Sequence, residues 1–262
     1  MCGRFILTQR IEKLGERFNV EVPPDLDFSA SYNIGPGSYT PVIASNNPDT
    51  LQLFQFGLTP FWAKKAMYLF NARSEGDRNK ENDTKYRGSK DIINKPAFRK
   101  PIRSQRCIIP ADAFIEGTTN ERLKKPYVVY LKDKVRPFAF AGIWDEWEDT
   151  NTQTTTYSFS IITTTANELL QKLPHHRSPV ILKQNDELKW LNSNTPLSQI
   201  TDMLHPYDAS LMNAYPIDAK ISNPRAQGRE LINPIGPPIE NDETFHVANH
   251  ITKSGFGRRK IR

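Results

Sequence analysis

Apolar residues recur at helical spacing near the start of the chain and at strand spacing through much of the rest. Ile11, Leu14 and Phe18 follow Thr8 at intervals of three or four residues, which predicts a short amphipathic helix with Thr8 as its N-cap. Such a helix would anchor the N-terminus. Residues 31–37 hold two glycines and a proline and are predicted to form an irregular loop.

Runs of branched and aromatic apolar residues predict strands separated by turns. The first two runs flank an Asn-Asn-Pro-Asp turn and are predicted to form a β-hairpin, and the third to fifth are predicted to form an antiparallel meander. The predicted strands lie at 39–44, 51–58, 127–131, 138–143, 157–162 and 211–217.

Helix signals return in the second half of the chain. The sequence Thr165-Ala166-Asn167-Glu168 matches a capping box, so a helix is predicted to start at Ala166 and to stop before Pro174. It delivers the sequence His175-His176-Arg177-Ser178-Pro179 to a loop. Two further predicted helices lie at 188–191 and 197–204, the second capped by Thr195 with Pro196 at its first position.

Two segments are polar and lack apolar periodicity. Residues 76–94 are predicted to form an exposed loop. The pattern is lost again beyond Gly236, so we expect one domain over residues 2–236 and a basic, disordered tail over 237–262.

Composition narrows the class of protein. With 262 residues, 37% hydrophobic and 24% charged, the sequence is typical of a globular protein, and no apolar segment is long enough to span a membrane. The two cysteines, Cys2 and Cys107, are too few for a disulfide framework and lack the paired spacing of a zinc site. We therefore expect a cytoplasmic protein without a metal or cofactor.

The charge is unevenly distributed. The net charge of +6 is as compatible with a polyanionic partner as with simple solubility. Between Arg73 and Arg106, however, eleven Lys and Arg residues face five Asp and Glu, so this segment alone carries 11 − 5 = +6. Trp62 lies just before it, and aromatic side chains beside cations are typical of single-strand binding, although core packing is their commoner role.

Cys2 is the first candidate for chemistry. If Met1 is removed, Cys2 carries an α-amine and a thiol on adjacent carbons, and both are partly deprotonated at neutral pH. The amine can form a Schiff base with an aldehyde, and the thiol can then close a five-membered thiazolidine. The alternative is an ordinary small residue at a mobile terminus.

Glu116 and His175 are the candidates for proton transfer. Glu116 directly follows the apolar pair Phe114-Ile115, where a strand is expected to be buried. It either ends that strand and faces water or handles protons. His175 and His176 can do acid-base work near neutral pH or lie idle on the surface.

An ordered set of motifs resembles one family, the SOS response-associated peptidase (SRAP) family of abasic-site DNA crosslinking proteins. The set covers roughly residues 2–236. In chain order it comprises Met1-Cys2-Gly3-Arg4-Phe5, Tyr32-Asn33-Ile34 with Pro36, Phe56-Gly57-Leu58-Thr59-Pro60-Phe61-Trp62, Asn71-Ala72-Arg73-Ser74-Glu75, Lys95-Pro96-Ala97-Phe98-Arg99, Arg106-Cys107-Ile108-Ile109-Pro110 with Glu116, and His175-His176-Arg177-Ser178-Pro179.

The resemblance implies a single α+β domain built on a mostly antiparallel, barrel-like β-sheet with peripheral helices. It places Cys2 in a positively charged groove as the nucleophile and makes Asn71 the residue that orients the N-terminus or the sugar. Glu116 would handle protons, and His175 would assist opening of the abasic sugar and stabilise the Schiff base. The DNA-binding residues would be Arg4, Trp62 and Arg73.

The chain departs from the family pattern at several positions. The segment 76–94 is longer than the pattern and the tail lies outside it, so neither inherits a role. The substituted positions are Phe56, Ile115, Gly117 and Ser178, which put substrate shape and rate in doubt.

Three functions remain open from the sequence. The first is a monomeric DNA-damage protein that captures abasic sites in single-stranded DNA as a thiazolidine, associated with the nucleoid if the cell is bacterial. The second is a thiol peptidase that acts on proteins, with His175 as base. The third is a nucleic-acid-binding module without chemistry. Only the crosslinker needs the freed amine of Cys2.

Overall fold

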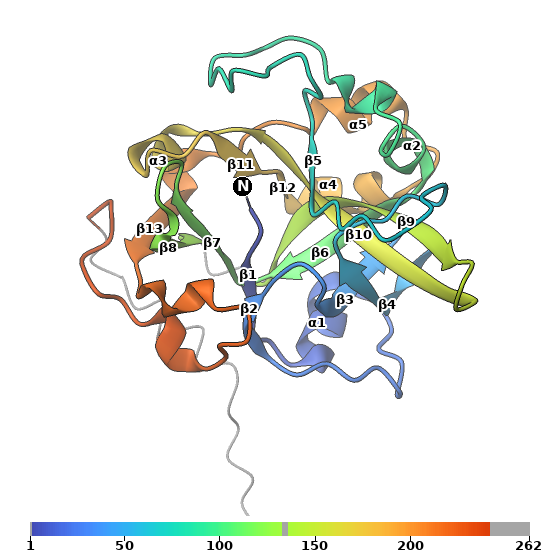
Figure 1. Cartoon of the computed structure of the whole chain (residues 1–262), viewed down its shortest axis with the longest axis horizontal. Helices are drawn as coiled ribbons and strands as arrows, with labels where there is room; N and C mark the ends of the chain where they lie inside the picture. The colour runs from blue at the N-terminus through green and yellow to red at the C-terminus, as the bar shows by residue number, and fades with distance from the viewer. Residues whose placement is uncertain (1, 133–135, 242–262) are drawn as a thin grey trace, which may run out of the picture.

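Two β-sheets meet along the N-terminal strand, which runs through the middle of the molecule (Figure 1). The computed structural model describes residues 2–132 and 136–241. The first sheet has the order β13-β8-β7-β1-β2, and the second has the order β11-β10-β4-β3-β6-β9-β12, with β5 paired to β10. Pairing is antiparallel except where β10 meets β4 and β5. The predicted α+β architecture with a mostly antiparallel, barrel-like sheet is confirmed.

The strands of the first sheet are β1 (Phe5–Leu7), β2 (Ser31–Ile34), β7 (Ala113–Thr118), β8 (Arg122–Leu131) and β13 (Met212–Pro216). Those of the second are β3 (Tyr39–Ala44), β4 (Asn47–Phe56), β5 (Asn71–Arg73), β6 (Arg106–Ala111), β9 (Phe138–Asp149), β10 (Thr154–Thr165), β11 (Arg177–Pro179) and β12 (Ile181–Leu182).

Short helices surround the sheets (Figure 1). Within the described part of the chain, none of them combines the length and apolarity needed to cross a membrane. The α-helices are α1 (Ile11–Phe18), α2 (Pro101–Ser104), α3 (Glu168–Lys172), α4 (Gln184–Leu191) and α5 (Leu197–Asp202). The 3-10 helices are η1 (Asp91–Asn94), η2 (Ala209–Leu211), η3 (Ala219–Ser222) and η4 (Arg229–Ile232).

The core fixes the N-terminal strand in place. Phe5 is fully buried, and its ring meets those of Phe56 and Phe140 edge-on at 5.6 and 6.0 Å between centroids. Such contacts add about 0.5–1.5 kcal/mol each to the burial of the rings. The first residues of the chain are therefore part of the core.

The predicted helices exist, but their starts differ from the prediction. Thr8 does not cap α1, because its backbone N–H and its hydroxyl both donate to Asp112 Oδ2, at 2.7 and 3.0 Å. Arg10 stands at the N-cap position. The helix predicted at Ala166 begins at Glu168, where Asn167 Oδ1 accepts from the N–H of Leu170 at 3.1 Å.

The predicted N-caps of α3 and α5 also differ from those in the structure. Thr165 is the last residue of β10 and takes no part in capping α3. Pro196, which was predicted at the first helical position of α5, stands at its N-cap, the place predicted for Thr195.

Three strand predictions need comment. The hairpin of β3 and β4 is confirmed, whereas the loop predicted at 31–37 was wrong in part because Ser31–Ile34 pair with β1 as β2. The meander was wrong at its first step, since β8 pairs with β7 and β13 and only β9 and β10 are neighbours. Val128 and Tyr130 of β8 pack in a separate small core with Tyr215 of β13, which draws β8 away from β9.

The structure describes all of the first polar segment, residues 76–94, and the start of the predicted tail. Residues 76–94 form turns that end in η1, with Asn79 and Ile92 buried. Of the predicted tail, residues 237–241 lie on the domain, where Glu240 N–H donates to Asn213 Oδ1 at 3.0 Å. Residues 242–262 lie outside the described residues.

Candidate active site

Cys2 lies in the interior at the start of β1. Its side chain is 1% exposed, so it is not at a mobile end of the chain. Asn71 of β5 donates from Nδ2 to the carbonyl oxygen of Cys2 at 2.8 Å. The other amide atom, Asn71 Oδ1, is buried and has no hydrogen-bond partner among the described residues. Asn71 therefore fixes the backbone of Cys2 and offers an acceptor beside it.

Glu116 projects from the middle of β7 and is 3% exposed. The alternative that it ends a strand and faces water is therefore wrong. Its Oε2 lies 3.3 Å from Nε2 of His175, which is 5% exposed. The strand β7 and the loop after α3 thus bring a carboxyl group and an imidazole together in the interior.

Burial moves both groups toward their neutral forms. It raises the pKa of Glu116 and lowers the pKa of His175 to about 3, because charge is poorly solvated there. Burial, and secondarily the charge of Glu116, raises the pKa of the Cys2 thiol. At neutral pH the imidazole is uncharged, and the thiol needs a base to ionise. A buried carboxyl group beside an imidazole is a candidate for proton transfer.

His175 and His176 occupy the short loop between α3 and β11. Their rings stack at 5.2 Å between centroids, and His176 Nδ1 lies 2.9 Å from the hydroxyl of Thr119. Thr119 also donates to the carbonyl of Pro174 at 2.7 Å, so this loop is tied to the end of β7. The predicted loop ends at His176, because Arg177–Pro179 pair with β10 as β11.

A cavity of about 560 Å³ opens over these groups. Its lining includes Gly3, Arg4, Pro36, Phe70, Ile115, Glu116, Gly117, Thr118, Thr119, Arg122, Leu123, His175 and His176.

Arg4 reaches the wall of this cavity from the start of the chain. Its Nη1 donates to Asn33 Oδ1 at 2.7 Å. Asn33 is itself buried and donates to the carbonyls of Ile221, Asn223 and Ala226. The Tyr-Asn-Ile motif therefore positions Arg4 and fastens residues 221–226.

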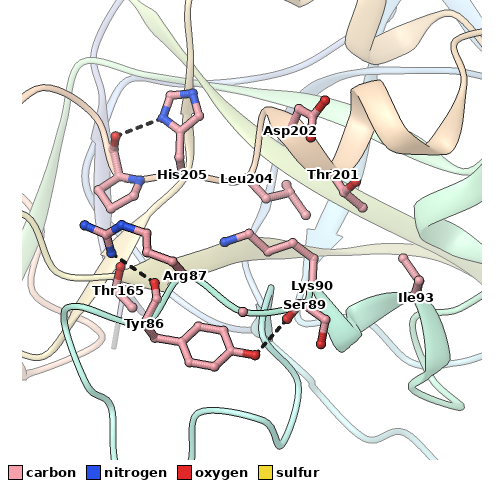
Figure 2. Close-up of a pocket in the computed structure, with 12 residues that line it drawn as sticks. Tyr86, Arg87, Ser89, Lys90, Ile93, Thr165, Thr201, Asp202, Leu204 and His205 are labelled. Carbon is pink, nitrogen blue, oxygen red and sulfur yellow. Dashed lines mark hydrogen bonds between the residues drawn. The ribbon is translucent and has the colours of Figure 1, made fainter.

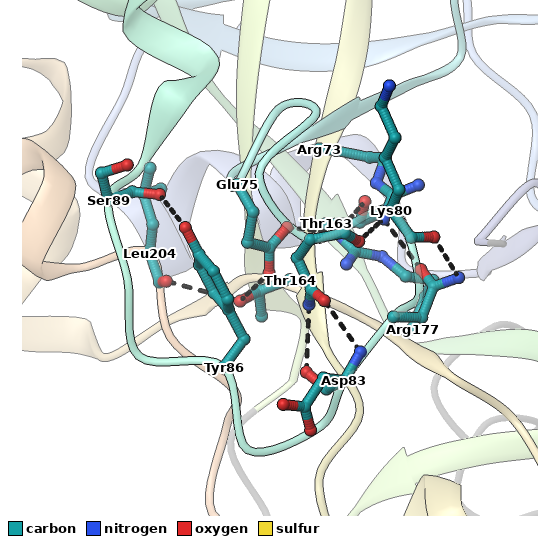
Figure 3. Close-up of polar contacts among 12 residues, drawn as sticks. Arg73, Glu75, Lys80, Asp83, Tyr86, Ser89, Thr163, Thr164, Arg177 and Leu204 are labelled. Carbon is teal, nitrogen blue, oxygen red and sulfur yellow. Dashed lines mark hydrogen bonds and ion pairs between the residues drawn. The ribbon is translucent and has the colours of Figure 1, made fainter.

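Arg73 does not line the cavity but lies close by on β5. Its Nη2 donates to Asn82 Oδ1 at 2.9 Å, within the segment 76–94. Arg177 of β11 is 2% exposed, bonds the carboxylate of the fully buried Glu75 at 2.9 Å and donates to Thr163 Oγ1 at 3.1 Å. Figure 3 shows Glu75 between Leu204 on one side and Arg73 and Arg177 on the other.

Arg177 is a site residue that sequence reasoning missed. Its Nε and Nη1 are buried without a hydrogen-bond partner among the described residues. Its place in the motif at 175–179, directly before the apolar run at 180–182, was the signal that it would be buried.

Trp62 lies away from the cavity on an exposed aromatic patch, defined as Phe61, Trp62, Met67 and Tyr68. These side chains are 42–55% exposed, so they do not pack in the core. Lys100 Nζ lies 4.7 Å from the centre of the Phe61 ring. Gly57, with φ +116°, directs the chain out of β4 into this patch, and a Cβ there would lie 3.2 Å from the Cα of Tyr68.

The departures from the family pattern are accommodated in packing. Phe56 stacks on Phe159 at 5.1 Å. Gly117 lies at a bulge where a Cβ would be 1.7 Å from the carbonyl oxygen of Arg122, so only glycine fits this backbone. Ile115 and Ser178 are buried.

Comparison with known proteins agrees with this geometry. A family model described as SOS response associated peptidase (SRAP) matches residues 1–224. The chain belongs to this family.

Relatives cover most of the chain. The abasic site processing protein YoqW of Bacillus subtilis is 36% identical over 239 residues, which is 88% of this chain and 99% of that protein. The abasic site processing protein HMCES of Gallus gallus is 26% identical over 92% of this chain and 80% of its own. A crystal structure of a Bacteroides thetaiotaomicron protein superposes with a TM-score of 0.74 at 28% identity, covering 89% of this chain and 99% of that one.

Proposed function

We propose that this protein captures abasic sites in single-stranded DNA through a thiazolidine formed by Cys2 after removal of Met1. The observation that carries the proposal is that Glu116 and His175 lie 3.3 Å apart on a cavity that Gly3 also lines, with the charge of Glu116 acting on the neighbouring Cys2 and Asn71 holding its carbonyl. Two relatives that are named abasic site processing proteins support it.

The chemistry begins with the amine. An abasic sugar in its ring-opened form presents an aldehyde, which the α-amine of Cys2 attacks to give a carbinolamine. Loss of water yields the imine, and the thiol then adds to the imine carbon while its proton passes to nitrogen. The product is a thiazolidine, and the balance is loss of one water.

The neighbouring groups match these proton movements. Glu116, with its raised pKa, can protonate the departing hydroxyl and accept the thiol proton, which a thiol whose own pKa is raised requires. His175 is neutral and lies 3.3 Å from Glu116, so it can pass a proton to or from the sugar oxygen during ring opening. Asn71 Oδ1 offers an acceptor to the amine or to a sugar hydroxyl.

A thiol peptidase acting on proteins is the second candidate, supported by the description of the family. The raised pKa of Cys2 disfavours it, because the thiolate is the nucleophile in such enzymes. In the crosslinker the amine makes the first attack, so a largely protonated thiol is tolerable.

The intact mass of the protein mixed with abasic single-stranded DNA tests the proposal. We expect a product equal to protein plus DNA minus one water for the wild type and none for Cys2→Ala. Cys107→Ala changes the other buried cysteine and serves as the control that still forms the product.

Three further outcomes would decide against the proposal. Full product formation by a chain that still carries an N-terminal tag would contradict it, since the amine would be acylated. Binding without a covalent product indicates a binding module, and Cys2-dependent cleavage of an added protein indicates the peptidase.

A further inference from the structure

A second cavity, of about 620 Å³, lies where the segment 76–94 meets the end of α5 (Figure 2). It shares no lining residue with the cavity beside Cys2. One wall is formed by residues 86–90 and Ile93, the other by Thr201, Asp202, Leu204, His205 and Pro206, and Thr165 closes it from the end of β10.

Two cations of the same segment face this space. Figure 2 shows the ammonium of Lys90 reaching across the space toward the stem of Arg87, whose guanidinium turns to the carbonyl of Tyr86. Lys90 is half-buried, and its ammonium has no hydrogen-bond or ion-pair partner within the residues that the structure describes. Arg87 is exposed and uses Nη1 to bond the carbonyls of Thr84 and Tyr86, at 3.2 and 2.9 Å.

No carboxylate of the cavity neutralises these cations. Asp202 also lines it, but Figure 2 shows its side chain well apart from both cationic groups. Burial lowers the pKa of Lys90; Glu75 counteracts this, and repulsion from Arg177 and Arg87 adds to it. Glu75 is already paired with Arg177. An anion between Lys90 and Arg87 would relieve their repulsion.

The remaining lining suits a nucleotide. The rings of Tyr86 and His205 border the cavity, with Tyr86 held by its hydroxyl on the Ser89 carbonyl at 3.1 Å. Flat rings beside cations are the usual surface for bases and phosphates of single strands.

The cavity also lies within reach of the first site. Thr163 of β10 is paired with Arg73 and bonds Arg177, whereas Thr165, two residues further, lines the second cavity. Two residues of a strand span about 6–7 Å. A DNA strand that passes Arg73 would therefore need few nucleotides to reach Lys90.

We propose that this cavity binds the phosphate group of a nucleotide unit between Lys90 and Arg87. The phosphate belongs either to the DNA strand that continues from the abasic site, which rests on the proposed function, or to a free nucleotide.

Equilibrium binding of two probes tests the proposal: a short oligothymidylate without an abasic site, and thymidine 5′-monophosphate. The variants are the double change Lys90→Gln with Arg87→Gln and the control Lys85→Gln. Lys85 is exposed in the same segment and does not line the cavity, so its change removes charge without touching the site. Thermal unfolding checks that each variant is folded.

If the source is the DNA strand, the double variant should bind the oligonucleotide at least about tenfold more weakly than Lys85→Gln. Its plot of log affinity against log salt should be shallower by about 0.7 for each lost phosphate contact. If the source is a free nucleotide, the double variant should lose binding of the monophosphate and keep that of the oligonucleotide. Equal behaviour of the double variant and Lys85→Gln toward both probes would overturn the proposal.

Neither probe contains an aldehyde, so the result is independent of the chemistry of Cys2. If the wild-type protein binds through this cavity but forms no adduct with abasic DNA, the proposed function is wrong and the phosphate site stands. If the double variant binds both probes normally and the wild type forms the adduct, the phosphate site is wrong and the proposed function stands.

Discussion

The cavity beside Cys2 and the cavity beside Lys90 are similar in size but differ in how deeply their ionisable groups are buried. Beside Cys2, a carboxyl group and an imidazole are almost fully buried, and burial shifts both toward their neutral forms. Beside Lys90, the cations stay in contact with solvent, and Arg87 is exposed. The buried pair of Glu75 and Arg177 touches both regions: Arg177 directly follows His176 of the first cavity, and Thr164 bonds both Glu75 and the carbonyl of Leu204 at the second.

This difference follows from what each task needs. Proton transfer requires groups that can gain or lose a proton at the working pH. Burial raises the pKa of a carboxyl group, and it keeps an imidazole neutral by lowering the pKa of the ring. Recognition of phosphate requires groups that keep their charge, which solvent allows at little cost. If both proposals hold, the more deeply buried groups carry out the chemistry and the more exposed ones bind phosphate.

The largest expected effect breaks the chemistry and leaves binding intact. Glu116→Gln and His175→Ala should each slow adduct formation by about 10²–10⁴-fold, the range usual for loss of a general acid or base. Affinity for intact single-stranded DNA should change little, because neither group is a cation at neutral pH. Rates of adduct formation and DNA affinity are measured on the same samples.

Two comparisons sharpen this test. Glu146→Gln makes the same chemical change at an exposed position and should form the adduct at the wild-type rate. His175→Ala should also release the adduct more slowly, since a group that assists ring opening and imine formation assists the reverse step, whereas Glu116→Gln should mainly impair formation. Wild-type formation rates in both site variants would place the catalytic groups elsewhere.

The next prediction tests the state of His175 through stability. The unfolded chain protonates this residue below about pH 6.5, whereas the folded chain does so only near pH 3, so acid between these values favours unfolding. The wild type should therefore lose up to about 1.4 kcal/mol more unfolding free energy per pH unit than His175→Gln as the pH falls below 6.5. Urea denaturation across this range measures it, and parallel curves would mean that His175 titrates normally in the fold.

Much of the fold could be predicted because local signals were strong. The hairpin of β3 and β4 and the helix α1 follow from periodicity, and both are present. The errors came from contacts that are distant in sequence. Thr8 reads as a cap locally but bonds Asp112, more than a hundred residues away, and β8 pairs with β7 and β13 instead of β9.

The candidate site was predictable to the extent that motifs carried it. Cys2, Glu116 and His175 were singled out from the residues themselves, and the resemblance added Asn71. The structure joins them as two pairs, Asn71 with the carbonyl of Cys2 and Glu116 with His175. The pairing of the buried Arg177 with Glu75 was missed, because the two residues are far apart in the sequence and no local signal joins them. The cavity beside Lys90 could not be predicted either, because residues 76–94, which form one of its walls, lack apolar periodicity.

A smaller effect is expected on the binding side. Trp62→Ala should weaken single-stranded DNA binding by about 1–3 kcal/mol if its exposed ring stacks on a base. Leu188→Ala removes another exposed apolar side chain, on α4, and should leave affinity unchanged. Fluorescence anisotropy with single-stranded and duplex DNA checks both points, and equal affinity for the two forms would contradict a stacking role.

The smallest expected effect concerns how the imidazoles are held. Thr119 bonds both the carbonyl of Pro174 and His176, so it ties the histidine loop to β7 at the edge of the cavity. Thr119→Val keeps the shape of the side chain and removes these bonds, each worth about 0.5–1.5 kcal/mol. We expect adduct formation to slow by up to about tenfold per lost bond, with DNA affinity unchanged. Thr119→Ser retains the hydroxyl and should form the adduct at the wild-type rate; if Thr119→Val does so too, burial alone positions His175 and the bond to His176 is incidental.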